Sequence, residues 1–150
     1  MSLNKEVEVL RDVPLFSKID HAKLKLLAFT SENLTHQDDS YLFREGEVGD
    51  SAYIILKGTV TVFIQTEKGQ VEVAELKRGD VVGEISILCD VPRTATVQAK
   101  DSVETLKITK DTFFHLVTEF PAIAIEIMRD LASRLNQTNI QLRKALNEDG

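Results

Sequence analysis

The sequence predicts a mainly β fold, a compact sandwich or barrel of short strands with helical segments before and after it. Apolar residues recur at helical spacing in the first third of the chain and again near its end. From Ser40 onward the spacing between them changes to two, which is typical of strands. Glycine-containing turns divide this stretch at short, fairly even intervals. With 150 residues, the chain fits one domain, which we divide into a helical segment, 1–36, a β segment, 37–110, and C-terminal helices, 111–150.

Two helices are expected before the strands. Pro14 separates them, and Asp20 is a suitable N-cap for the second, because its carboxylate can accept hydrogen bonds from free backbone N–H groups. Their apolar faces are formed by Leu3, Val7 and Leu10 in the first helix and by Leu24, Leu27 and Ala28 in the second.

The strands are marked by apolar residues that alternate with polar residues or with residues of the opposite face. In chain order these are Tyr41 and Phe43; Ala52, Ile54 and Leu56; Val60, Val62 and Ile64; Ala95, Val97 and Ala99; and Val103, Leu106 and Ile108. Turns at Gly46, Gly58, Gly69 and Gly79 separate several of them. Residues 83–97 interrupt the β structure with a short apolar turn.

Helices return at the end of the chain. We expect a short one between Asp111, its cap, and Pro121, because the residue before a proline disfavours helix. Its apolar residues are Phe113, Phe114 and Val117. The remainder follows one long helical pattern of roughly 40 Å.

The long helix carries a seam that is typical of a coiled coil, with steps of three and four. Its members are Met128, Leu131, Leu135, Thr138, Leu142 and Ala145. This pattern predicts a homodimer in which the distal end of the helix packs on a second subunit. In the alternative, only the first apolar residues dock on the domain and the end of the helix frays.

Composition excludes several classes of protein. The net charge is −6, with lysines and arginines scattered among carboxylates, so binding to nucleic acid is not expected. Cys89 is the only cysteine and cannot form an internal disulfide, and no apolar run approaches a membrane span or a secretory leader. We therefore expect a cytoplasmic protein with no membrane partner.

The residues with the clearest chemistry lie between Gly83 and Val97. Gly83 lets the backbone approach a ligand closely, and a helical turn starting near Glu84 would direct unpaired N–H groups at an anion. Arg93 would supply the countercharge, because a planar guanidinium matches two phosphate oxygens. An ionised Glu84 can only accept hydrogen bonds, so it suits a sugar hydroxyl. Together these residues predict a site for the sugar and phosphate of a nucleotide.

Each of these residues also has a purely structural interpretation. Glu84 could be a favourable acid at the start of a helix, and Arg93 could be a surface ion-pair partner. Small hydroxyl residues such as Ser86 and Thr94 often satisfy turns. The combination of acid, base and glycine in one short segment favours the binding function.

Catalysis and metal binding are not expected. His21, His36 and His115 lack the spacing of a metal site, so a cupin-like metalloenzyme would have no ligand set. No nucleophile elbow, Walker sequence or kinase signature occurs, and Ser86 has no evident base. The sequence therefore predicts no cofactor and no enzymatic activity.

Several short motifs occur in an order that is specific as a set. They are Pro14-Leu15-Phe16-Ser17, Phe43-Arg44-Glu45-Gly46-Glu47, Gly49-Asp50, Tyr53-Ile54-Ile55 with Lys57-Gly58, Arg78-Gly79-Asp80 and the segment 83–97. In this order they resemble the cyclic nucleotide-binding domain family, which includes the regulatory subunits of cyclic-nucleotide-dependent kinases, gated channels and the bacterial catabolite activator protein. The segment 83–97 carries the strongest resemblance because it retains both the acid and the base.

The resemblance implies an eight-stranded double-stranded β-helix, a jelly-roll-like β-roll, with residues 83–97 as a phosphate-binding cassette between the sixth and seventh strands. Glu84 would accept from the ribose 2′-hydroxyl and Arg93 would pair with the cyclic phosphate. Amides near Ile85 and Ser86 would complete the anion cradle. Thr94 stands where cGMP-responsive domains often carry threonine, so the implied ligand is cAMP or cGMP.

The resemblance also implies a regulatory domain, in which a bound cyclic purine nucleotide repositions the C-terminal helix. Thr138 and Asn139 lie in the stretch that resembles the adenine-reading part of the bacterial activator, which makes them the expected base contacts. Two other functions fit the sequence: a dimerisation or scaffolding module that binds no nucleotide, and the sensory half of a transcription regulator without its DNA-binding domain. The sequence ends at Gly150 with no helix-turn-helix, kinase or channel segment, so it does not identify an effector.

Overall fold

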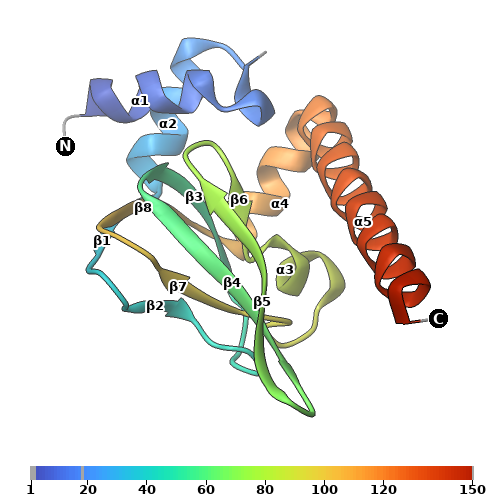
Figure 1. The fold of residues 1–150 in the computed structure, drawn as a ribbon. Coiled ribbons are helices and arrows are strands. Elements are labelled where there is room, and N and C mark those ends of the chain that lie inside the picture. The colour runs from blue at the N-terminus through green and yellow to red at the C-terminus, as the bar shows by residue number, and fades with distance from the viewer. Residues whose placement is uncertain (1–2, 18, 150) are drawn as a thin grey trace.

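Two four-stranded antiparallel sheets form the centre of the computed structural model, which describes residues 3–17 and 19–149. One sheet has the strand order β1-β8-β3-β6 and the other the order β2-β7-β4-β5. The strands are β1 Glu32–His36, β2 Tyr41–Phe43, β3 Ser51–Lys57, β4 Thr59–Thr66, β5 Gly69–Lys77, β6 Val81–Val82, β7 Thr96–Ala99 and β8 Val103–Thr109. These eight strands confirm the β-roll that the sequence predicts (Figure 1).

Helices cover one end and one side of the roll. They are α1 Leu3–Asp12, the 3-10 turn η1 Pro14–Phe16, α2 His21–Thr30, α3 Glu84–Cys89, α4 Lys110–Glu119 and α5 Pro121–Asp149. In Figure 1, α1 and α2 lie at one end of the roll, and α5 runs along its side with α3 between α5 and the strands. Within the described residues, none of these helices is both long and apolar enough to cross a membrane.

The two N-terminal helices form as the sequence predicts. Asp20 caps α2, because its Oδ1 accepts a hydrogen bond of 3.1 Å from the backbone N–H of Lys23. The apolar faces of both helices are buried, through Val7 and Leu10 in α1 and Leu24, Leu27 and Ala28 in α2. The side chain of Leu3, expected on the same face of α1, lies outside the part that the structure describes.

The strand β1 corrects the sequence analysis, which placed residues 1–36 in a helical segment. Its sequence, Glu-Asn-Leu-Thr-His, contains one aliphatic residue and therefore shows no apolar alternation. The strand exists because it pairs antiparallel with β8, from Glu32 opposite Lys107 to His36 opposite Val103. A strand at a sheet edge can thus be defined by its partner more than by its own pattern.

Strand β3 is buried on both faces and belongs to two apolar clusters. Ala52, Ile54 and Leu56 pack with the helices in one cluster. Tyr53 and Ile55 point the other way and pack inside the roll, between the two sheets. The helices and the roll therefore share this strand as common core.

The start of α4 differs by two residues from the prediction. Thr109, and not Asp111, is its N-cap, since the Thr109 hydroxyl accepts a hydrogen bond of 3.3 Å from the backbone N–H of Thr112. Asp111 lies instead in the first turn, where its charge favours the helix dipole. The helix ends at Glu119, and Pro121 begins α5, a position that suits the missing N–H of proline.

Only the first half of α5 packs on the domain. The helix has 29 residues, about 43 Å at the α-helical rise. Ile123 and Ile127 are buried, and Leu131 packs against the same cluster. The sequence analysis expected Leu131 to belong to a free seam. In the structure this residue packs on the domain instead.

A second stripe of α5 is exposed, and we call it the α5 stripe. Its members alternate at steps of four and three, and they are Met128, Ala132, Leu135, Asn139, Leu142 and Leu146. Met128, Leu135, Leu142 and Leu146 remain 60%, 62%, 57% and 64% exposed. Three of the expected seam residues, Met128, Leu135 and Leu142, belong to the α5 stripe. Thr138 was also expected in the seam, but it lies one turn beyond Arg134 on the side of the helix that faces the domain.

Candidate functional site

The centre of the candidate site is the start of α3. Gly83 precedes this helix with φ +86, in the left-handed region that favours glycine. A Cβ at this position would lie 2.5 Å from Nη1 of Arg93. Both the backbone conformation and the close approach to Arg93 therefore require glycine. The sequence analysis expected a close approach to a ligand, which stays a prediction.

Arg93 is buried beside Gly83, with only 4% of its surface exposed. Its Nη1 donates to the Gly83 carbonyl oxygen at 3.0 Å, and Nη2 donates to Oγ of Ser51 at 3.4 Å. The guanidinium carbon lies 4.1 Å from the ring centroid of Phe43, a cation–π contact. Nε has no hydrogen-bond partner, and none of the described carboxylates forms an ion pair with this side chain.

The surroundings of Arg93 act on its charge in opposite directions. Burial lowers the pKa of the guanidinium, while Tyr53, Asp50, Glu47 and Glu84 act to raise it. Arginine stays protonated in proteins. The site therefore holds a desolvated cation with donors still free to meet an anion.

A loop before β3 fixes the backbone of Arg93. The Gly46 N–H donates to the Arg93 carbonyl and the Arg93 N–H donates to the Glu47 carbonyl, both at 2.8 Å. The same loop passes directly over α3 at Gly49, where a Cβ would lie 2.3 Å from Cβ of Ser86. Gly49 thus has a packing role in the site that its motif alone did not indicate.

Glu84 is the second buried charge, with 2% of its surface exposed. Its Oε1 lies 3.4 Å from Nη1 of Arg134, a residue of α5. Burial raises the pKa of the Glu84 carboxyl, and the Arg134 charge opposes this rise. Sequence reasoning gave Arg134 no role, because its partner lies 50 residues away along the chain.

A cavity of about 70 Å³ opens between the roll, α3 and α5. Five of the expected site residues line it, namely Gly83, Glu84, Ile85, Ser86 and Thr94. Arg93 is not among the lining residues, but its guanidinium packs on Gly83, which is. Thr138 and Asn139 are exposed on α5 and do not line the cavity.

The cavity is smaller than the 300–1,000 Å³ that ligand sites commonly occupy. Its other walls are Phe43, Val62, Leu76, Val82, Ala95, Val97 and Arg134. Arg134 is the only one of these that comes from α5. In this structure the arginine therefore closes the cavity on the α5 side.

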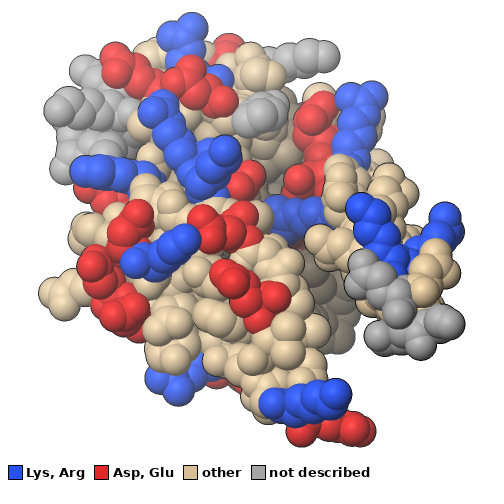
Figure 2. Space-filling view, viewed as in Figure 1, with Lys and Arg blue, Asp and Glu red and all other residues tan. Residues whose placement is uncertain are grey.

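Two further features concern possible metal ligands and surface charge. They contain no group of three or more His, Cys, Asp or Glu side chains placed to hold a metal ion. The net charge of the chain is −6. On the face that Figure 2 shows, Lys and Arg side chains lie among Asp and Glu side chains. A site for an anion must then depend on local groups such as Arg93.

Comparison with known proteins points to one family. The model of the cyclic nucleotide-binding domain matches residues 34–120. The chain is 32% identical over 109 residues to a cAMP-dependent protein kinase regulatory subunit from Blastocladiella emersonii, covering 72% of the chain and 27% of that protein. It is also 35% identical over 95 residues to lysophospholipase NTE1 of Phaeosphaeria nodorum, covering 63% of the chain and 6% of that protein. The chain thus spans about a quarter or less of the length of these relatives.

Solved structures agree on the fold. The catabolite activator protein of Thermus thermophilus superposes with a TM-score of 0.76 at 25% identity, over 86% of this chain and 61% of that one. The regulatory subunit of a cAMP-independent protein kinase A from Trypanosoma brucei superposes with a TM-score of 0.77 at 27% identity, over 93% of this chain and 51% of that one.

Proposed function

Because the chain belongs to the cyclic nucleotide-binding domain family, we propose that it binds a cyclic purine nucleotide, cAMP or cGMP, as a regulatory domain. The observation that carries this proposal is the state of Arg93. A buried guanidinium with no paired carboxylate among the described residues and a free Nε is costly to the fold. A cyclic phosphate would supply the missing charge and acceptors.

In the proposed complex, each cassette residue meets one part of the ligand. Arg93 and the backbone amides near Ile85 and Ser86 hold the phosphate. Glu84 accepts from the ribose 2′-hydroxyl, which an ionised carboxylate can do from a buried position. Thr94 lines the cavity, and its hydroxyl would contact the phosphate or a guanine amino group.

Binding requires the site to open. A nucleotide does not fit about 70 Å³, so the proposed function includes a movement of α5 and its Arg134. Thr138 would contact the base only when the distal half of α5 comes to its own roll, whereas Asn139 lies on the exposed α5 stripe. Such contacts would favour one position of α5 over another, and this difference is what lets a ligand act as a signal.

We also propose a homodimer that uses the α5 stripe. An exposed row of large apolar residues at coiled-coil spacing is stabilised by a second copy of the same row. Asn139 belongs to this stripe and Thr138 does not, so in a dimer Asn139 would face the partner subunit while Thr138 faces its own domain. We also propose that the protein is located in the cytoplasm.

Ligand binding and the role of Arg93 can be tested together. Isothermal titration with cAMP and cGMP should give saturable binding to the wild type, and Arg93→Ala should weaken it by about 2 to 5 kcal/mol, as for loss of a buried charge partner. Arg93→Lys keeps the charge but not the bidentate geometry of the guanidinium. Its affinity for the ligand should therefore lie between those of the wild type and Arg93→Ala. Melting curves of both variants serve as the folding control. Equal affinity of wild type and Arg93→Ala would remove this residue from the site.

A second candidate function is a module that keeps the fold and binds no cyclic nucleotide. The small cavity favours it, and so does the likeness to a kinase regulatory subunit described as cAMP-independent. A thermal-shift panel separates the two functions, since a ligand at 100 times its Kd stabilises the folded state by about 2.7 kcal/mol. Absence of a shift with cAMP, cGMP and cyclic dinucleotides would support this second function.

A further inference from the structure

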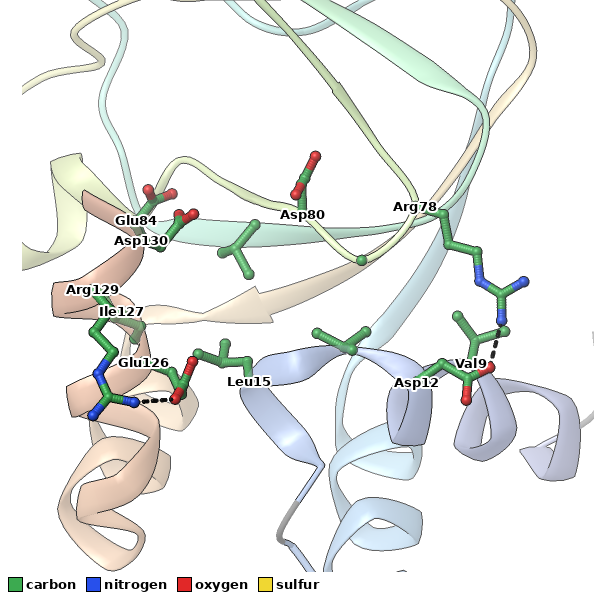
Figure 3. A pocket seen from close by; sticks show the side chains of 13 residues that line it. Val9, Asp12, Leu15, Arg78, Asp80, Glu84, Glu126, Ile127, Arg129 and Asp130 are labelled. Atoms are coloured by element: carbon green, nitrogen blue, oxygen red, sulfur yellow. Dashed lines mark hydrogen bonds and ion pairs between the residues drawn. The ribbon is translucent and has the colours of Figure 1, made fainter. Parts of the chain in front are cut away.

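Arg93 is held differently from the arginines around a second cavity of the structure. This cavity, of about 470 Å³, lies between α1, the β5–β6 turn and α5. Arg78 pairs there with Asp12 at 2.9 Å, and Arg129 pairs with Glu126 at 3.1 Å (Figure 3). Arg93 has no such pair among the described carboxylates, and an aromatic ring lies against its charge instead.

The ring belongs to Phe43, the last residue of β2. This strand pairs with β7, and the pairing places Phe43 opposite Val97, four residues after Arg93 in the chain. The side chain is buried, and its ring packs against the ring of Tyr53 in β3 with 6.0 Å between the centroids. Its Cε2 would lie 3.3 Å from a Cβ placed at Gly83. Strand pairing and packing in the roll thus fix the ring independently of Arg93.

The guanidinium of Arg93 uses its face and its edge for different partners. Its carbon lies 4.1 Å from the centroid of the Phe43 ring, whose electron-rich face attracts a cation. The N–H donors point in the plane of the group, where Nη1 donates to Gly83, Nη2 donates to Ser51 and Nε has no partner. A carboxylate in the place of the ring would compete with a phosphate for these donors. The ring attracts the charge without occupying them.

We propose that Phe43 is a positioning residue, which holds the buried charge of Arg93 in place while the ligand site is empty and leaves its N–H donors free for a phosphate. This inference deepens the proposed function and rests on it, because a phosphate is the expected partner of Arg93. Without the attraction of the ring, the guanidinium would spend part of its time in other positions. The apparent affinity of the ligand would then fall with the fraction of protein in which Arg93 is in place.

The test changes the electrostatics of the ring at nearly constant shape. Phe43 is replaced by mono-, di- and trifluorinated phenylalanine, because each fluorine withdraws electron density from the ring face. In chemical denaturation without ligand, the equilibrium constant for folding should fall stepwise, by about five- to thirtyfold with three fluorines, the range of a desolvated cation–π contact. In calorimetric titration, the affinity for cAMP should fall in the same order. A folding constant or an affinity that stays unchanged across the series would overturn the proposal.

Two controls separate this contact from the general effects of fluorine. In an Arg93→Met background, the fluorinated rings at Phe43 should no longer lower the folding constant, because the cation is absent. Phe16 is 2% exposed in the apolar cluster of the helices and forms no cation–π contact with a described cation, so the same series there reports the effect of fluorine in a packed core. An equal loss in either control would overturn the electrostatic role of the Phe43 ring.

The measurements without ligand separate this inference from the proposed function. If neither cAMP nor cGMP binds the wild type, the proposed function fails, whereas the folding constants of the fluorinated series still decide whether Phe43 holds Arg93. If cAMP binds with an affinity that the series leaves unchanged, this inference is overturned and the proposed function stands.

Discussion

At the scale of single residues, Glu84 illustrates a conflict between stability and binding. A carboxylate that is 2% exposed loses most of its hydration, and its hydrogen bond from Arg134 is long at 3.4 Å. Burial therefore raises the pKa of Glu84 above its ordinary value. Such a residue is easier to explain by a ligand than by the fold, since a neutral side chain would pack in its place at lower cost.

We expect Glu84→Gln to raise the stability of the ligand-free protein by about 1 kcal/mol at neutral pH. In the wild type, the folded state binds the Glu84 proton more tightly than the unfolded state does. The free energy of unfolding therefore falls as pH rises through the window from the unfolded pKa to the raised folded pKa, and stays reduced above it. The advantage of Gln should be largest at neutral pH and vanish below about pH 4.

Chemical denaturation of both proteins at several pH values measures this difference, with Glu104→Gln as a control at a partly buried carboxylate. The Glu84→Gln variant also tests the contact with the sugar. Glu84→Gln should lose the preference of the site for cAMP over its 2′-deoxy analogue. A destabilised Glu84→Gln protein at pH 7 would contradict the assignment of Glu84 as a strained acid.

At the scale of elements, α5 is divided between two environments. Its first half is fixed by Ile123 and Ile127, which are buried in the helical cluster. Its second half is described by the structure as a continuous helix with every residue from Leu135 to Asn147 exposed. An isolated helix of this length is marginal in water, which is one reason why we propose a partner for the α5 stripe.

We expect the wild type to form a dimer and Leu135→Glu to be monomeric. A charge in the middle of an apolar seam must be desolvated against the partner, which opposes association. Sedimentation velocity at several protein concentrations measures the outcome, and Gln137→Glu, on the opposite side of the helix, is the matched control. A monomeric wild type at high concentration, or an equal effect of the control, would contradict the dimer.

At the scale of the whole molecule, the two apolar clusters are joined by the strands they share. In β3, Ile54 faces the helices and Ile55 faces the interior of the roll. In β8, Leu106 likewise faces the helices and Val103 faces the interior of the roll. Loss of either cluster would expose one face of both strands, so neither cluster should persist without the other.

We therefore predict that the ligand-free protein unfolds in one cooperative transition, as expected for a single domain of residues 1–150. Scanning calorimetry of the monomeric Leu135→Glu variant, in which dissociation is not coupled to unfolding, should give equal calorimetric and van't Hoff enthalpies. A fluorescent label on α2 and another on β5 should report the same midpoint. Two resolved transitions would mean that the helical segment and the roll are separate folding units.

The sequence by itself determined the parts of this protein that depend on local pattern. Helical spacing identified α1, α2, α4 and α5, and alternation identified the apolar strands, because burial of one face repeats along each element. The acid and base of the cassette were also recognisable, since Glu84 and Arg93 lie in one short segment with Gly83. The motif order then indicated the family, which the match over residues 34–120 supports.

Only the tertiary structure decided what depends on segments that are distant in sequence. Strand β1 has no apolar alternation and is defined by its pairing with β8. The contact of Arg134 with Glu84 joins residues 50 positions apart, and the free stripe of α5 is set by which side of the helix the domain already covers. The physical reason is common to all three, since a local pattern specifies which face of an element is apolar but not which partner will meet it.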